Sequence, residues 1–168
     1  MEVSKKNISV VLQGPIDERT HEAIDSYAEQ GFEEIFVSTW SDEDTSLLNS
    51  STHDFKLILS DYPDMTSITK DFVLKVRTDE FYPDLSKFIK NWEKYPERLH
   101  TTNNGFWKHV PFNFSNHIYL CKKQTLFEAC SMIVHHSTGK ILQDLNLISS
   151  EQAVGFFLMK SLGHNLNE

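Results

Sequence analysis

Four short apolar runs in the first half of the chain each end on small or polar residues. They cover residues 8–12, 35–37, 55–59 and 72–76. Continuous apolar runs rich in β-branched residues are typical of strands that are buried on both faces of a parallel sheet. The polar residues that follow the runs include Gln13, Ser38, Asp61 and Asp79. Parallel strands would bring these side chains to one edge of the sheet, which is where open α/β folds bind ligands.

Helical patterns lie between and after these runs. The predicted helices begin near Thr20, Asp84, Lys123 and Ser149. Thr20 and Asp84 are candidate N-caps, and Gly31 suits the left-handed residue that ends the first helix. Trp92 falls on the apolar face of the second helix, and a further strand is predicted over residues 118–121. The pattern therefore predicts an α/β fold with a mostly parallel central sheet flanked by helices.

The connection between the third and fourth runs is short. Only residues 60–71 are available for it, and they include Pro63. A parallel crossover needs a dozen or more residues and usually contains a helix. Either this crossover is unusually tight, or a helical segment present in relatives has been lost.

Composition narrows the classes of protein that fit this pattern. The 168 residues, 39% of them hydrophobic, suffice for one domain with a substantial core. A formal charge of -8 without any Lys/Arg run disfavours nucleic-acid binding. The apolar run near the N-terminus is too short for a signal peptide or a membrane span, so we expect a cytoplasmic protein without a transmembrane segment. Cys121 and Cys130 lack metal-site spacing, and neither a disulfide nor zinc is predicted.

The stretch from Asp71 to Asp84 reads D-F-V-L-K-V-R-T-D-E-F-Y-P-D. A buried strand that delivers an arginine and two acids at its carboxyl end is typical of a site in an open α/β sheet. The structural alternative is a strand that meets solvent at a polar turn. A plain nucleotide-binding α/β module is the less favoured class, because neither G-x-G-x-x-G nor G-x-x-x-x-G-K occurs in the sequence.

Five segments spread along the chain form a joint pattern. They are I-S-V-V-L-Q-G-P-I (8–16), V-S-T-W (37–40), F-V-L-K-V-R-T-D (72–79), P-F-N-F-S-N-H-I-Y-L (111–120) and S-E-Q-A-V (150–154). Together they resemble the WavE lipopolysaccharide-synthesis family, a group of glycosyltransferases expected to have the Rossmann-like, nucleotide-sugar-binding GT-A fold.

The resemblance implies one GT-A-like domain over residues 1–168, with a nucleotide-sugar-binding half in 1–80 and an acceptor-side half in 81–168. It implies a glycosyltransferase that moves a sugar from a nucleotide-sugar donor to a glycan or lipid-linked glycan acceptor, with a divalent metal, Mn²⁺ or Mg²⁺. The alternative is a catalytically degenerate GT-A-like domain that binds a nucleotide sugar or a glycan.

The metal expectation falls on Asp79. GT-A enzymes carry a D-x-D motif after the fourth strand, but this chain reads R-T-D-E. Arg77 stands where the first acid would be, and Glu80 is expected to point elsewhere. A cation held by carboxylate and phosphate oxygens stabilises the charge of a leaving nucleoside diphosphate. Asp79 is therefore the predicted metal ligand, and Arg77 a predicted phosphate ligand.

By the same analogy, the donor lies against the ends of the first three strands. The residues predicted to bind it are Gln13, Gly14, Pro15, Ser38, Thr39, Trp40 and Asp61. Those after the first strand offer amide and backbone groups, Ser38 and Thr39 offer hydroxyls to the ribose, and Trp40 flanks the base. The structural alternatives are a packed loop aromatic for Trp40 and a turn cap for Asp61.

An inverting transfer needs a base that takes the proton of the acceptor hydroxyl. Glu151 is the predicted catalytic base, because it resembles the base that GT-A enzymes place at a helix start. The alternative for Glu151 is electrostatic capping of the helix dipole. His117 is the second catalytic candidate, ahead of His109, as a base, a metal ligand or an acceptor contact.

Overall fold

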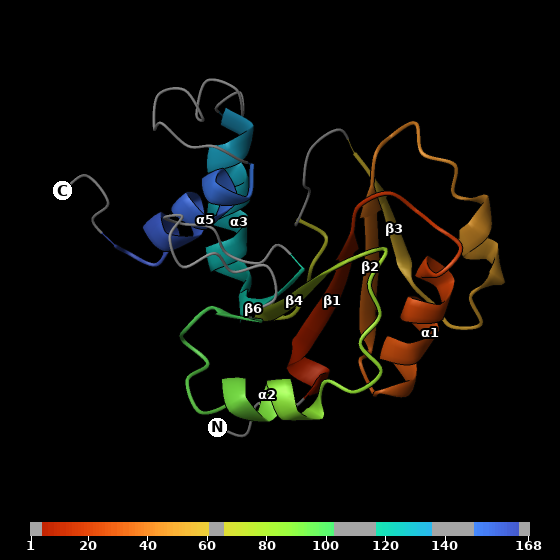
Figure 1. Ribbon diagram of the computed structural model, residues 1–168, viewed down its shortest axis with the longest axis horizontal. Coiled ribbons are helices and arrows are strands. Elements are labelled where there is room, and N and C mark those ends of the chain that lie inside the picture. Colours follow the sequence, from red (N-terminus) through yellow and green to blue (C-terminus); the bar gives the residue numbers. More distant parts are fainter. Residues whose placement is uncertain (1–4, 61–65, 103–116, 136–149, 165–168) are drawn as a thin grey trace.

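The computed structural model describes residues 5–60, 66–102, 117–135 and 150–164, and the side chains of all of these except 132–135, 150 and 151. A six-stranded mixed sheet in the order β3-β2-β1-β4-β6-β5 forms its centre (Figure 1). The strands are β1 (Ile8–Gln13), β2 (Glu34–Thr39), β3 (Lys56–Leu59), β4 (Phe72–Arg77), β5 (His100–Thr101) and β6 (Ile118–Lys122). The first four strands are parallel to one another, and β6 is antiparallel to β4 and β5. The predicted α/β class with a mostly parallel sheet is confirmed.

Helices cover both faces of the sheet. They are α1 (Thr20–Glu29), α2 (Ser86–Trp92), α3 (Lys123–His135) and α5 (Ser150–Ser161), with 3₁₀ turns η1 (Lys5–Asn7) and η2 (Ser46–Ser50). One core packs α1 and α2 against the sheet and contains the fully buried Trp92, as the sequence predicted. The other core packs α3 and α5 against the opposite face around Val73 and Tyr119. Figure 1 shows α3 and α5 side by side over the β4 and β6 end of the sheet.

Two of the predicted N-caps are wrong. Thr20 is itself the first residue of α1, whose N-cap is Arg19. The Thr20 hydroxyl, fully buried, lies 3.2 Å from the carbonyl oxygen of Thr78 at the end of β4, so a tertiary contact takes the group that would have capped the helix. Helix α2 begins at Ser86, and Asp84 instead accepts the Ser86 N–H in a local turn (2.8 Å).

The connection between β3 and β4 is a tight crossover. It passes two strands, because β2 and β1 lie between β3 and β4, and its described residues 66–71 contain a turn but no helix. Ile68, 2% exposed, packs with Val11, Phe36 and Val73 on the face that α3 covers. Helix α1, which joins β1 to β2, packs on the other face. The strand order reverses between β1 and β4, because β1 leads to β2 on one side whereas β4 leads to β5 and β6 on the other, and the two strands flank a topological switch point.

A buried carboxylate fixes this crossover to the sheet. Glu34, 7% exposed at the start of β2, accepts hydrogen bonds from the Ser9 hydroxyl, the Thr69 hydroxyl (2.7 Å) and the Thr69 N–H (3.2 Å). Lys56 Nζ donates a further hydrogen bond (3.2 Å). Burial alone would raise the pKa of Glu34, but these hydrogen bonds outweigh burial and lower the pKa to about 2. Glu34 is therefore ionised at neutral pH and links β1, β2, β3 and the crossover.

Replacing Glu34 tests this link. Because the pKa of Glu34 is lower in the folded than in the unfolded chain, its ionisation stabilises the fold above the unfolded pKa and ceases to do so as the pH falls toward 2. Glu34→Gln should lower the free energy of unfolding at neutral pH by about 2 kcal/mol. Urea unfolding between about pH 6 and about pH 3 should then show a shallower loss of stability in the variant than in the wild type.

Glu33→Gln is the matched control. Its carboxylate pairs with Lys6, and both side chains are more than half exposed (51% and 71%). We expect a change below about 0.5 kcal/mol. Equal effects of the two substitutions would contradict the proposed role of Glu34.

Candidate functional site at the carboxyl edge of β1, β2 and β4

The strand register places three predicted site residues in one row. Gln13 on β1 is the Cα partner of Ser38 on β2 and of Arg77 on β4. Aligned partners in a sheet direct their side chains to the same face. That face is the one packed by α3, since Val11 and Val73 of the same strands belong to its core. The Arg77 N–H also donates to the carbonyl oxygen of His117 (3.2 Å), which brings His117 to the same edge.

The loop after β1 is held against the end of β4. Gly14 N–H donates to Ser38 O (3.2 Å), and Thr78 N–H donates to Gln13 O (3.4 Å). The Thr78 hydroxyl donates to Pro15 O. Gly14 has φ +139°, and a Cβ there would lie 2.8 Å from Thr78 Oγ1. Both the backbone conformation and the close approach therefore require glycine at this position.

Arg77 and Asp79 form a two-pronged ion pair. Arg77 Nε donates to Asp79 Oδ1 (2.8 Å), and a terminal guanidinium nitrogen donates to Oδ2 (2.5 Å). This hydrogen bonding with Arg77 is the main reason that the pKa of Asp79 is lowered, against the opposing effect of burial. The two side chains are 38% and 36% exposed. The ion pair therefore places a charged guanidinium and an ionised carboxylate at the switch point, both accessible to a ligand.

Glu80 orients His117. One Glu80 oxygen pairs with His117 Nδ1, and the other accepts the Tyr82 hydroxyl (2.7 Å). Arg77 Nε lies 4.0 Å from the same carboxylate. Burial, followed by the Glu80 hydrogen bond, raises the pKa of Tyr82, so the phenol keeps its proton and donates it. The sequence predicted that Glu80 would point away from the site. Residue spacing could not reveal its pairing with His117, because the two residues lie 37 positions apart.

The end of β2 presents an aromatic ring and buried hydroxyls. Trp40 is 48% exposed, whereas Ser38 and Thr39 are each 5% exposed. Within the described residues, Thr39 Oγ1 is buried without a hydrogen-bond partner. Glu43 accepts the Ile16 N–H (3.0 Å), which ties the loop after β2 to the loop after β1. With this exposure Trp40 is not a packed loop aromatic, and its role beside the base stays a prediction.

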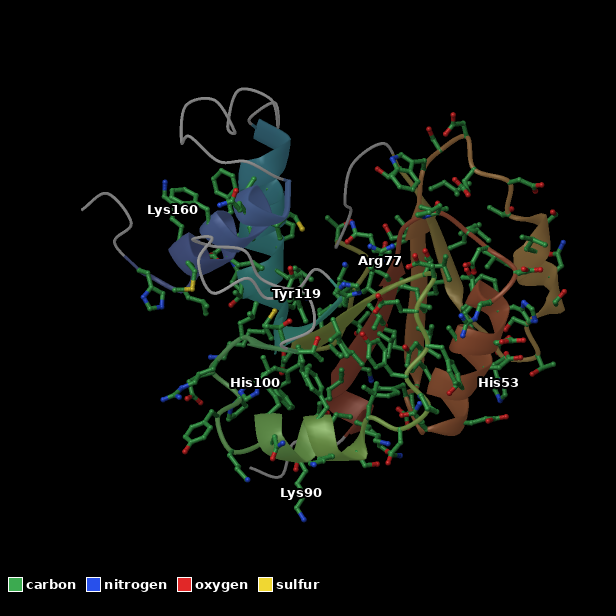
Figure 2. The ribbon with its side chains drawn as sticks, in the orientation of Figure 1. His53, Arg77, Lys90, His100, Tyr119 and Lys160 are labelled. Atoms are coloured by element: carbon green, nitrogen blue, oxygen red, sulfur yellow. The ribbon has the colours of Figure 1, made fainter. Side chains whose placement is uncertain are left out.

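Lys75 is a further cation, and it lies inside the apolar run that predicts the fourth strand. It lies two residues before Arg77 on the same face of β4, is 8% exposed, and its Nζ lies 5.6 Å from the centre of the Tyr119 ring. Burial, and then the charge of Arg77, lower its pKa to about 8, while Glu80, Cys130 and Asp79 act in the opposite direction. Figure 2 labels Arg77 and also Tyr119, which is the Cα partner of Lys75 on β6.

The structure does not describe some of the predicted site residues or their side chains. Asp61 and His109 lie outside the described residues. Glu151 lies in the first turn of α5, but its side chain is not among those described. Their predicted roles stay predictions.

The described side chains do not fit a divalent metal well. Both oxygens of Asp79 accept hydrogen bonds from Arg77, and both oxygens of Glu80 are engaged by His117 and Tyr82. Across the described ranges, no group of three or more His, Cys, Asp or Glu residues is placed to hold a metal ion. Asp79 as a metal ligand stays a prediction, and the guanidinium of Arg77 occupies the position that a cation would take beside it.

Comparisons with protein-family models and with curated proteins show no family for this chain. No protein-family model matches the sequence, and a search of curated proteins finds no significant match. Among the described residues, no helix is both long and apolar enough to span a membrane.

Substitution of Gly14 tests the geometry of the loop. Gly14→Ala should lower the free energy of unfolding by about 2 to 3 kcal/mol, because it combines an unfavourable φ with a clash against Thr78. Gly31→Ala is the control, since Gly31 has φ +90° with nothing within 4 Å of a built Cβ. It should cost only about 1 kcal/mol. Urea unfolding measures both, and a Gly14 effect no larger than that of Gly31 would refute the close approach.

Proposed function

We propose that the chain is a glycosyltransferase of GT-A type that binds a nucleotide-sugar donor at the carboxyl edge of β1, β2 and β4. The observation that carries the proposal is the convergence of Gln13, Ser38 and Arg77 in one row at the switch point between β1 and β4. Ligands of open α/β sheets bind in the crevice at such a point. The resemblance of five segments to WavE glycosyltransferases supports a nucleotide sugar as the ligand.

The donor is held by three kinds of group. Trp40 stacks on the base, and the hydroxyl of Ser38, on the same face as Gln13 and Arg77, hydrogen-bonds to the ribose. The loop of Gln13 and Gly14 lies against the diphosphate, and Arg77 binds a phosphate oxygen. A guanidinium carries five N–H donors, and its pairing with Asp79 fixes its plane before the ligand arrives.

His117 is the base that the geometry supports. With Nδ1–H donated to Glu80, Nε2 carries the lone pair that accepts the proton of the acceptor hydroxyl. The acceptor oxygen forms a bond to the anomeric carbon, the bond from that carbon to the phosphate oxygen breaks, and the nucleoside diphosphate leaves with both electrons. Glu80 then stabilises the imidazolium. Glu151 is the other candidate base, and the acceptor is a glycan or lipid-linked glycan.

A second function, donor or glycan binding without turnover, is favoured by one observation. The carboxylate expected to anchor a metal is bound to Arg77 instead. Binding and turnover therefore have to be measured separately.

Calorimetry and product release test the main proposal. At least one of the UDP-, GDP- or TDP-linked sugars should bind the purified chain, and nucleoside diphosphate should be released on turnover. His117→Gln should lower turnover by about 10²- to 10⁴-fold with little change in donor affinity. Glu80→Gln, which removes the orienting carboxylate, should lower turnover by about 10- to 100-fold.

The two functions give different results in this experiment. Donor binding without release of nucleoside diphosphate supports the binding-only domain. If none of the donors binds, with or without Mn²⁺, the nucleotide-sugar site itself is excluded.

Trp40 provides an independent test of base stacking. Trp40→Ala should weaken nucleotide affinity by about 1 to 3 kcal/mol and remove the quenching of tryptophan fluorescence on nucleotide binding. Tyr95→Ala is the matched control, because Tyr95 is equally exposed (48%) but follows α2. Unchanged affinity in Trp40→Ala would place the base elsewhere.

A further inference from the structure

We infer that the donor diphosphate is bound by two side-chain cations of β4, Lys75 and Arg77, which take the place of a metal ion held by Asp79. This inference rests on the proposed function and concerns how the same site recognises the anionic part of its ligand. Lys75 becomes a binding residue within a strand whose central residues are otherwise buried in the core.

The placement of Lys75 is the first observation. Residues 75 and 77 alternate onto the same face of β4, about 6.6 Å apart along the strand. The Cα partners of Lys75 are Val11 on β1 and Tyr119 on β6. Its side chain therefore lies on the same face of the sheet at the switch point, two residues before the row of Ser38, Gln13 and Arg77 along β4.

The repulsion between the two cations is the second observation. Lys75 is 8% exposed. The positive charge of Arg77 on the same face of β4 repels it, while the acids Asp79 and Glu80 follow the strand at its outer end. From the other packed elements, Lys75 faces the Tyr119 ring of β6 and the Cys130 thiol of α3. A diphosphate lying over this face would relieve the repulsion between the two cations.

The engagement of Asp79 is the third observation. Its carboxylate oxygens both accept hydrogen bonds from Arg77, so Asp79 acts as a positioning residue that holds the guanidinium flat against the site. Cations fixed in this way stabilise the charge that develops on a leaving diphosphate. The two cations, Lys75 and Arg77, thus lie on one face of β4, whereas the acids Asp79 and Glu80 follow the strand at its carboxyl end.

Calorimetry with UDP and GDP as probes, each in EDTA and in Mn²⁺, tests the inference on the wild-type chain. We expect the better-bound probe to keep its affinity within about threefold when the metal is removed. Lys75→Met keeps the packing volume of the side chain and should weaken binding of that probe by at least tenfold. Binding of the matching nucleoside, uridine or guanosine, should remain unchanged, because it carries no phosphate.

Lys56→Met is the matched control. Lys56 also lies over an aromatic ring on the same face, with Nζ 5.1 Å from the centre of Phe36, but on the edge strand β3. It should leave binding of the diphosphate probe unchanged. If Lys75→Met fails to fold, as judged by circular dichroism, the EDTA arm on the wild type and Arg77→Gln decide the question.

The outcomes separate this inference from the proposed function. Binding that EDTA abolishes, or that Lys75→Met leaves intact, overturns the inference and leaves the nucleotide-sugar site standing. The absence of binding to any nucleotide or nucleotide sugar under either condition overturns the proposed function and the inference with it.

Discussion

The parallel pairing of β1 with β4 is the constraint on which the site depends. These strands are neighbours in the sheet although Ile8 and its partner Phe72 lie far apart in the sequence. The chain after β1 leads to β2 on one side, and the chain after β4 leads to β5 and β6 on the other side, so the strand order reverses between the two strands at their carboxyl edge. Gln13 and Arg77 face each other across this edge only because the pairing continues to the last residue of both strands. A slip of β4 by one residue would send Arg77 to the other face and separate it from Gln13.

A small set of hydroxyl contacts keeps the edge in this form. The Thr78 side chain binds the loop after β1, while the Thr78 carbonyl oxygen lies against the Thr20 hydroxyl at the start of α1. The loop after β2 joins through Glu43 and Ile16. Three strand ends and one helix start are therefore held together by groups that have no part in the proposed chemistry. These contacts make the backbone at the strand ends rigid, and a rigid backbone keeps the ligand-facing side chains in place.

The sequence predicted the strands and the edge where they end, because buried parallel strands have a local signature in their apolar runs. It did not predict what depends on distant partners. Thr20 looked like a helix cap, but Thr78 binds its hydroxyl. Glu80 looked unused, but it pairs with a histidine that an antiparallel strand returns to the same edge. Lys75 was hidden inside an apolar run, and its burial is visible only once β1 and β6 flank it.

Strand β6 passes into α3 without a linker, since β6 ends at Lys122 and α3 begins at Lys123. The junction is anchored, because Lys123 donates its N–H to Asp71 O (2.8 Å) and its Nζ to Ile68 O (3.1 Å). A shift of β6 by one residue would also rotate α3 by about 100° and turn its apolar face out of the core. The packing of α3 at one end of β6 therefore fixes the register of β6, and with it the position of His117 at the other end. Insertions or deletions at this junction would disturb the edge of the sheet as directly as a substitution there.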